Sequence, residues 1–290
     1  MSKRDIYQQI TDRIVSKLEQ GEIPWKKPFT SLKKSYPRNF VSKNMYNGAN
    51  FFLTLLEGRN TPYWLTYNQA KQLGGNVKKG ESGTPIVYFQ FIEKTNDKGE
   101  LYRYPMVKHS TVFNLEQVEG IVNPFEAEME SLLCKSEFNN IESCERLINM
   151  FDVKIPLVRH SLMENAYYSP MQDFISMPLK ERFKEEQFYY STLFHEIAHS
   201  TGHESRLARP GIIKPNKKGS YEYAREELVA ELSASFICAE AGIVKETEEN
   251  TTAYIQSWLN VLKNDSKIVY DAMRDSFKVL EHLQILDKAA

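Results

Sequence analysis

Five consecutive residues, His195-Glu196-Ile197-Ala198-His199, constrain this chain more than any other part of its sequence. They lie within residues 188–201, where apolar side chains recur at the spacing of an amphipathic helix. Side chains four positions apart on a helix lie on one face, one turn apart, so both imidazoles can reach the same ion. The pattern is typical of a zinc site, with a chance match on an ordinary helix as the alternative. We predict one Zn2+ per chain, with His195 and His199 as ligands.

Glu196 lies beside the two histidines and does not have to bind the metal itself. From that position it can take a proton from water on the zinc and pass it to the leaving nitrogen of a peptide. Zinc lowers the pKa of such a water to ~7, which makes the reaction accessible at neutral pH. The motif therefore predicts a zinc-dependent metallopeptidase with Glu196 as its general base.

A third protein ligand is expected from the predicted helix at residues 221–241. Glu227 is our first choice, and Glu231, four positions later, is then placed to orient a ligating histidine from behind. Glu226 and Glu231 stay open as alternative ligands, and so does His203. The group that would stabilise the developing oxyanion stays open as well. The candidates near the motif are Tyr221, Tyr223, His203 and Arg225.

Two short predicted strands in the same part of the chain offer a way to hold a substrate. Residues 166–169 or 174–178 could pair with an extended peptide, as the edge strands of sheets do. This expectation rests on analogy with other peptidase folds.

Charge is distributed unevenly along the chain, although the net charge is -1. Residues 1–120 contain 18 Lys+Arg against 11 Asp+Glu, a net charge of +7, whereas residues 121–290 carry -8. Opposite charge in the two halves favours two domains with different partners, and an anionic ligand for the first.

The segment 23–56 combines basic and aromatic residues and contains no acidic ones. Lysines bind phosphates and aromatic rings stack on unpaired bases, which is the chemistry of single-stranded DNA binding. A solvated basic loop with its aromatics in the core is the alternative. The predicted DNA-binding residues, including two further lysines, are Trp25, Lys26, Lys27, Lys33, Lys34, Arg38, Lys43, Tyr46, Lys78 and Lys79.

Hydrophobic periodicity predicts an α+β protein. Helices are expected at residues 5–20, 66–73, 138–150, 188–201, 221–241, 251–263 and 267–286. Strands are expected as a pair within 77–91 around a turn at 79–83, at 102–113, at 155–158, and as a pair within 166–178. We predict two domains: a DNA-binding domain at 1–122, a connector at 123–135 and a zincin-like metallopeptidase domain at 136–290.

Location follows from what the sequence lacks. No apolar run is long enough to cross a bilayer, and the N-terminal residues have no apolar signal-peptide core. The three cysteines form no CxxC pair, which favours reduced, buried thiols. We expect a cytoplasmic protein without membrane contact.

Short motifs along nearly the whole chain resemble the ArdC-type antirestriction proteins of plasmids and other mobile elements. In the first half they are Leu18-Glu19-Gln20-Gly21, Pro24-Trp25, Pro37-Arg38-Asn39, Tyr46-Asn47-Gly48, Trp64-Leu65-Thr66-Tyr67, Lys79-Gly80-Glu81 and Val112-Phe113-Asn114. In the second half they are His195-Glu196-Ile197-Ala198-His199, Ser200-Thr201-Gly202-His203 and Tyr223-Ala224-Arg225-Glu226-Glu227-Leu228-Val229-Ala230-Glu231.

The resemblance implies an N-terminal single-stranded DNA-binding domain joined to a zinc-metallopeptidase domain similar to the Spartan proteases, which digest proteins crosslinked to DNA. It implies protection of incoming DNA from host restriction during conjugation, with His195 and His199 as zinc ligands and Glu196 as the base. The expected partners are single-stranded DNA and a protein substrate bound to it. Two alternatives remain: a protective DNA-binding protein with an idle zinc site, and a general peptidase whose basic domain binds acidic proteins.

Overall fold

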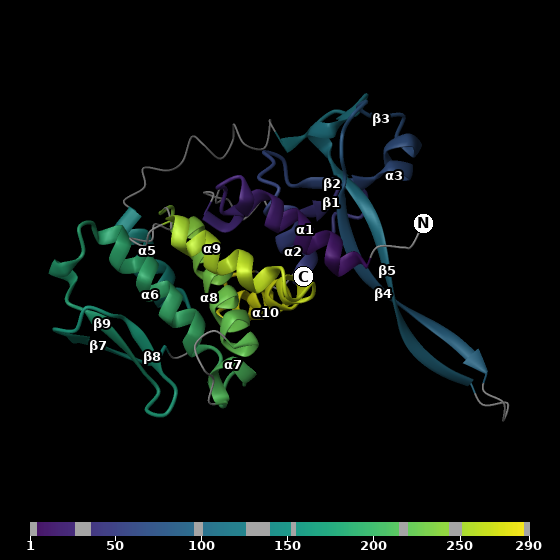
Figure 1. Ribbon diagram of the computed structural model, residues 1–290. Coiled ribbons are helices and arrows are strands. Elements are labelled where there is room, and N and C mark those ends of the chain that lie inside the picture. The colour runs from purple at the N-terminus through teal and green to yellow at the C-terminus, as the bar shows by residue number, and fades with distance from the viewer. Residues whose placement is uncertain are drawn as a thin grey trace.

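The computed structural model describes residues 5–26, 36–95, 101–125, 140–151, 155–214, 220–243 and 251–286. Figure 1 shows a body of helices with a small sheet at one end and a second sheet at the other, from which a long two-stranded ribbon projects. The predicted α+β class with two domains is confirmed. Within the described part of the chain, no helix is both long and apolar enough to span a bilayer.

Helix α1 (Ile6–Glu19) forms as its sequence predicts. Asp5 caps its N-terminus by accepting a hydrogen bond from the backbone N–H of Tyr7 at 3.1 Å. Gly21, with a φ of +79°, lies just beyond its C-terminus, where the left-handed conformation favours glycine. One face of α1 is buried against helices α9 (Thr251–Leu262) and α10 (Ile268–His282).

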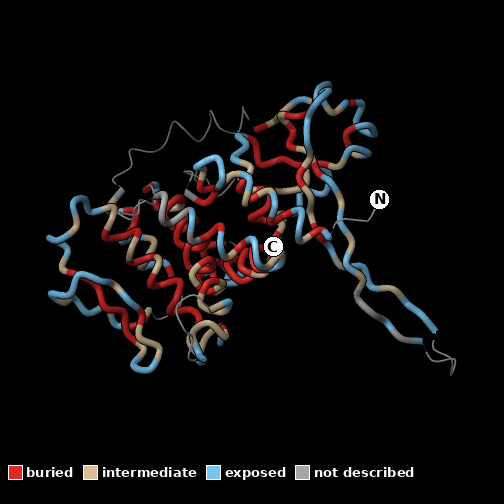
Figure 2. The backbone as a smooth tube through the Cα atoms, viewed as in Figure 1, coloured by how far each residue is buried: buried red, intermediate tan, exposed pale blue. Residues whose placement is uncertain are grey.

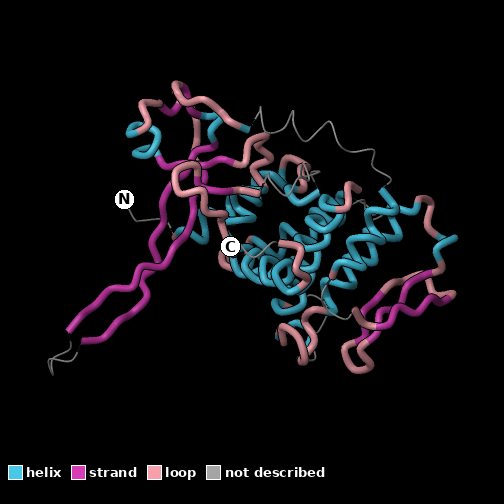
Figure 3. The backbone as a smooth tube through the Cα atoms, turned by 180° about the vertical axis from the view of Figure 1, so that it is seen from behind, coloured by secondary structure: helices cyan, strands magenta, loops and turns pink. Residues whose placement is uncertain are grey.

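The first sheet has the strand order β1-β2-β5-β4. Its strands are β1 (Arg38–Asn39), β2 (Tyr63–Thr66), β4 (Thr84–Thr95) and β5 (Leu101–Asn114). Only β1 and β2 are parallel, and the β4–β5 hairpin extends far beyond the other strands (Figure 3). Where the ribbon projects beyond the sheet, large apolar side chains among the described residues are exposed, for example those of Phe91 and Leu101.

The predicted strand pair within residues 77–91 is wrong. Strand β3 (Asn76–Val77) pairs with β6 (Val118–Glu119), and β4 pairs with β5 along its whole length. A twelve-residue antiparallel ladder satisfies many more backbone N–H and C=O groups than a short pair around the turn at 79–83 could. Around β3 and β6 lies a second, smaller core that includes helix α3 (Tyr67–Gln72) and the 3-10 turn η3 (Leu115–Gln117).

The second half of the chain is mainly helical and carries a three-stranded sheet of order β7-β9-β8. Its elements are α5 (Asn140–Met150), β7 (Leu157–Ser161), β8 (Tyr167–Ser169), β9 (Phe174–Pro178), η4 (Lys180–Arg182), α6 (Glu186–Ser200), α7 (Pro210–Ile213), α8 (Tyr221–Glu240), α9 and α10. Helix α8 runs through the middle of the body, and most of its residues are buried, as the red trace in Figure 2 shows.

One hydrophobic core joins the two halves of the sequence. Helix α2 (Gly48–Leu55) packs on α10. Its Phe51 ring lies 5.4 Å from those of Phe236 on α8 and Phe277 on α10. In the same way Trp25, in the 3-10 turn η1 (Pro24–Lys26), lies 5.9 Å from Trp258 on α9. The helices of the N-terminal half therefore support those of the C-terminal half.

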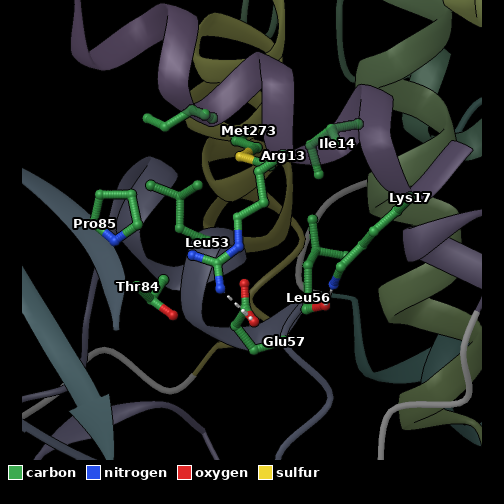
Figure 4. A pocket seen from close by; sticks show the side chains of 10 residues that line it. Arg13, Ile14, Lys17, Leu53, Leu56, Glu57, Thr84, Pro85 and Met273 are labelled. Carbon is green, nitrogen blue, oxygen red and sulfur yellow. Dashed lines mark hydrogen bonds and ion pairs between the residues drawn. The ribbon is translucent and has the colours of Figure 1, made fainter. Parts of the chain in front are cut away.

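Polar contacts connect α1, α2 and β4, which surround a small pocket (Figure 4). Arg13 pairs with Glu57 at 3.0 Å and donates a second hydrogen bond to the carbonyl of Gly83 at 3.2 Å. Lys17 donates to the carbonyl of Leu56, at the end of α2. The basic side chains of α1 thus tie the helical body to the first sheet.

Candidate metal centre

Helices α6 and α8 bring three of the predicted metal ligands together. The Nε2 atoms of His195 and His199 lie 3.1 Å apart. The carboxylate of Glu227 approaches both, with Oε2 3.6 Å from Nε2 of His195 and Oε1 3.8 Å from Nε2 of His199. One ligand atom from each of these residues lies within 4.8 Å of the others.

These distances fit a small divalent cation. In a tetrahedral zinc site with bonds of about 2.0–2.1 Å, neighbouring ligand atoms lie about 3.3 Å apart. Three protein ligands are also the number found in catalytic zinc sites, which leave a further position for water or substrate. The donor set of two imidazoles and a carboxylate is also one that zinc prefers.

Carboxylates behind the two histidines orient them. Glu226 Oε1 lies 3.1 Å from Nδ1 of His199, and Glu231 Oε1 lies 3.5 Å from Nδ1 of His195. Because an ionised carboxylate can only accept, Nδ1 of His199 donates to Glu226, and its Nε2 is the nitrogen that faces the centre. The two Nε2 atoms and the carboxylate of Glu227 converge on one place, where a proton or a metal ion would be stabilised.

The pKa values of His199 and Glu227 are shifted because several carboxylates surround the two histidines. Burial alone would lower the pKa of His199, but its hydrogen bond to Glu226 and the charges of Glu227 and Glu196 raise the pKa to about 9. Burial alone would raise the pKa of Glu227, but contact with His195 and the charge of His199 lower it to about 2. A proton or a metal ion at the centre relieves the same repulsion.

The alternative ligands lie elsewhere. Glu226 faces Nδ1 of His199 rather than the centre. His203 follows the end of α6, and its Nδ1 lies 2.8 Å from the Oγ of Ser205. The group of potential metal ligands found among the described residues contains neither of them.

Of the four candidates for stabilising an oxyanion, Tyr223 is the one with an interaction to a proposed metal ligand among the contacts of the described residues. It is half-buried one turn before Glu227 on α8, and its side chain hydrogen-bonds the carboxylate of Glu227. Arg225 pairs with Asp275 on α10, and Tyr221 is exposed at the start of α8. His203 makes the Ser205 contact described above.

Comparisons with known proteins agree with this geometry. Residues 4–113 match the family described as the N-terminal domain of anti-restriction factor ArdC, and residues 142–275 match the family of zincin-like metallopeptidases. The crystal structure of the antirestriction protein ArdC from plasmid R388 is 34% identical, covers 97% of both chains and superposes with a TM-score of 0.73. The chain belongs to the ArdC antirestriction family.

A second crystal structure of the R388 ArdC protein, described as Mn(II)-bound, is 33% identical with a TM-score of 0.74 and covers 97% of this chain and 98% of that one. The uncharacterized protein y4eC of Sinorhizobium fredii is 32% identical over 92% of this chain and 88% of its own length. Two DNA primases TraC of Escherichia coli are 30% and 32% identical over 97% and 96% of this chain. This chain spans only 20% and 27% of the length of those primases.

One predicted substrate strand of this ArdC family member is wrong. Strand β9 is the middle strand of its sheet and pairs with β7 on one side and β8 on the other. Both of its edges are occupied, so it cannot add a peptide. Strand β8 pairs only with β9 among the described strands, and it packs against α6, the helix of the metal centre.

Two of the predicted DNA-binding residues contribute to the protein core. Trp25 is 1% exposed and packs on Trp258, so no base can stack on its ring in this conformation. Tyr46 is half-buried against the main core, and burial raises the pKa of its hydroxyl. The alternative that aromatics of this segment belong to the core therefore holds for these two. Three further predicted residues, Lys27, Lys33 and Lys34, lie outside the described residues. The backbone of Lys26 is described, but its side chain is not.

The remaining predicted basic residues lie at the surface. Lys43, Lys78 and Lys79 are exposed, and Arg38 is half-buried with its Nε donating to the carbonyl of Tyr36. The ammonium group of Lys43 lies 4.2 Å from the ring centre of Phe40.

Two features were missed by the sequence analysis. Arg209 makes a buried ion pair with Glu226, and no local pattern marks it as part of the site. In the first half the exposed large aromatics are Tyr67, Tyr88 and Phe91 among the described residues, of which Tyr67 opens α3 in the Trp64-Leu65-Thr66-Tyr67 motif.

Proposed function

We propose that this chain is an antirestriction protein of a mobile element that binds single-stranded DNA and hydrolyses peptide bonds in proteins associated with that DNA. The convergence of His195, His199 and Glu227, with Glu196 on the same helix as the histidines, carries the proposal. Membership of the ArdC family supports the antirestriction role.

Each residue has a defined part in the proposed peptidase. His195, His199 and Glu227 hold the metal, and Glu231 supports His195 from behind. A bound Zn2+ would supply a water of lowered pKa and polarise the carbonyl of the substrate. Glu196 takes the proton of the attacking water and delivers it to the leaving nitrogen. Tyr223 is our choice for stabilising the oxyanion. The edge of β8 that pairs with no described strand is our choice for pairing with the substrate backbone.

Zinc is the metal that we propose, although a relative has been crystallised with Mn(II). Imidazole ligands suit zinc, whereas manganese prefers oxygen donors in six-coordinate sites. In the general order of affinities, zinc also binds such nitrogen and oxygen sites more tightly than manganese. Direct competition between the two ions in the purified protein tests this choice.

The ligand assignment predicts different losses for two glutamates on α8. Glu227→Ala should weaken Zn2+ affinity by more than about 100-fold, because it removes a ligand. Glu231→Ala should weaken it by about 10–100-fold, because it removes only the group that orients His195. Competition with a chromogenic chelator measures both, and Glu222→Ala, one turn before the site on the same helix, is the control. Retention of Zn2+ by Glu227→Ala together with its loss from Glu231→Ala would reverse the assignment.

We place the DNA interface on the N-terminal half, at its exposed lysines and exposed aromatic residues. Tyr67 is 50% exposed, and the ammonium group of Lys71 lies 5.8 Å from its ring centre. This pair can stack on a base and contact its phosphate. Helix α3 and the turn that carries Lys43 are neighbours in the fold, because Asn39 at that turn donates a hydrogen bond to Gln69 of α3 at 3.1 Å.

Tyr67→Ala should weaken the binding of the full chain to a single-stranded oligonucleotide by roughly 5- to 150-fold, which corresponds to about 1–3 kcal/mol for one stacked base. Lys43→Gln should reduce the slope of log affinity against log salt by about 0.7, the value for one phosphate contact on a single strand. Fluorescence anisotropy at several salt concentrations measures both. Lys278→Gln, an exposed lysine on α10, is the matched control and should change neither. No binding of the wild-type chain to single strands would refute this part of the proposal.

A further inference from the structure

A buried arginine lies directly behind the proposed metal centre. Arg209, which precedes α7, is 6% exposed. Its guanidinium forms two parallel hydrogen bonds with Glu226, from Nε to Oε2 at 2.9 Å and from Nη2 to Oε1 at 2.7 Å. It also donates to the Thr201 hydroxyl at 2.6 Å and to the Ala198 carbonyl at 2.7 Å. Arg209 therefore joins the C-terminal end of α6 to α8.

The partner of Arg209 touches a proposed metal ligand. Glu226 is 5% exposed, and its Oε1 atom contacts both Nη2 of Arg209 and Nδ1 of His199, the latter at 3.1 Å. The fork of Arg209 fixes the plane of the carboxylate, because guanidinium and carboxylate match in two hydrogen bonds. A carboxylate fixed in this plane determines the rotation of the His199 ring.

Two glycines leave room for this pair. A Cβ atom at Gly202 would lie 2.9 Å from Nη2 of Arg209 and 2.6 Å from Cγ1 of Ile212. A Cβ atom at Gly211 would lie 2.6 Å from Cβ of Glu226. None of these three distances is possible without a shift of the neighbouring atoms, so both glycines pack closely against the ion pair.

We infer that Arg209 is a positioning residue for the metal centre: it holds Glu226 so that Glu226 keeps Nε2 of His199 directed at the metal. This inference rests on the proposed metal-binding function. It assigns Glu226 and Arg209 a role in metal affinity and geometry, and it takes Glu226 out of the ligand set.

Arg209→Lys tests the inference, since lysine keeps the charge but cannot form the two-pronged contact. Its Zn2+ affinity should fall by about 10–100-fold, the range found for groups that orient a ligand. Chelator competition well below the melting temperature of the metal-stripped chain measures the affinity, and circular dichroism checks its fold. Arg206→Lys is the matched control: Arg206 also pairs with a carboxylate through two nitrogens, but with Asp173 on the β8–β9 turn. The control should keep its affinity within about twofold.

A double variant separates positioning from a merely structural role. If Arg209 acts through Glu226, Arg209→Lys combined with Glu226→Gln should lose no more Zn2+ affinity than Glu226→Gln alone. An Arg209→Lys chain that melts earlier but binds Zn2+ as the wild type does would overturn the inference, and so would fully additive losses. If Arg209→Lys does not fold, Glu226→Gln alone must still weaken Zn2+ binding, or the inference fails. A wild-type chain that binds no Zn2+ would instead overturn the proposed function, and this inference with it.

Discussion

Glu196→Gln is expected to slow peptide hydrolysis by about 10²–10⁴-fold, the usual contribution of a general base. Glu196 follows His195 directly on α6 and is buried. It does not belong to the group of converging ligands, so the variant should bind Zn2+ within about twofold of the wild type. Glutamine has almost the same shape but cannot accept the proton, and this isolates the chemical step.

The assay follows the release of peptides from a denatured protein substrate, with and without a single-stranded oligonucleotide, at saturating Zn2+. Glu186→Gln, in the exposed first turn of the same helix, is the control and should retain full activity. Equal hydrolysis by Glu196→Gln and wild type would show that another group is the base.

The same variant separates the peptidase from its alternative in cells. A protective DNA-binding protein with an idle metal site would give Glu196→Gln undiminished antirestriction. Loss of antirestriction with unchanged DNA binding and unchanged Zn2+ affinity would make proteolysis part of the protective function.

Local patterns were sufficient to predict which residues converge at the proposed metal centre. The spacing of His195 and His199 on one helix and of Glu227 and Glu231 on another is a property of helical periodicity, which the sequence displays directly. Their convergence needs only that the two helices pack on their apolar sides, and α6 and α8 do so.

Features that depend on distant pairing could not be predicted in this way. The ion-pair partner of Arg209, Glu226, lies 17 positions further along the chain. Arginines are also usually exposed, so nothing in the sequence marks this one as buried. The partner of β3 lies about forty residues further on, beyond the β4–β5 ribbon. Trp25 stands among lysines in the sequence, but its ring contributes most when it is buried, and Trp258 provides the partner.

The shared core carries the second large prediction. Phe51 is 0% exposed and touches Tyr36 and Phe52 from the N-terminal half, and Phe236 and Phe277 from the C-terminal half. Phe51→Ala should lower the free energy of unfolding by about 3–5 kcal/mol, the usual cost of removing a buried phenylalanine ring. Phe91→Ala, on the β4–β5 ribbon, removes the same ring where it is 66% exposed and should cost within about 0.5 kcal/mol.

Urea unfolding of the full chain, followed both by far-UV circular dichroism and by release of Zn2+, tests whether the halves are coupled. Phe236 lies on α8, the helix that carries Glu227 and Glu231, so loss of the Phe51 contact should loosen the ligand helix as well. We therefore expect Phe51→Ala to shift both signals to lower urea together. If the variant loses structure in one transition and releases Zn2+ at the wild-type urea concentration in another, the two halves unfold independently. Metal binding would then depend only on the C-terminal half, and any effect of DNA on the peptidase site would need a route other than this core.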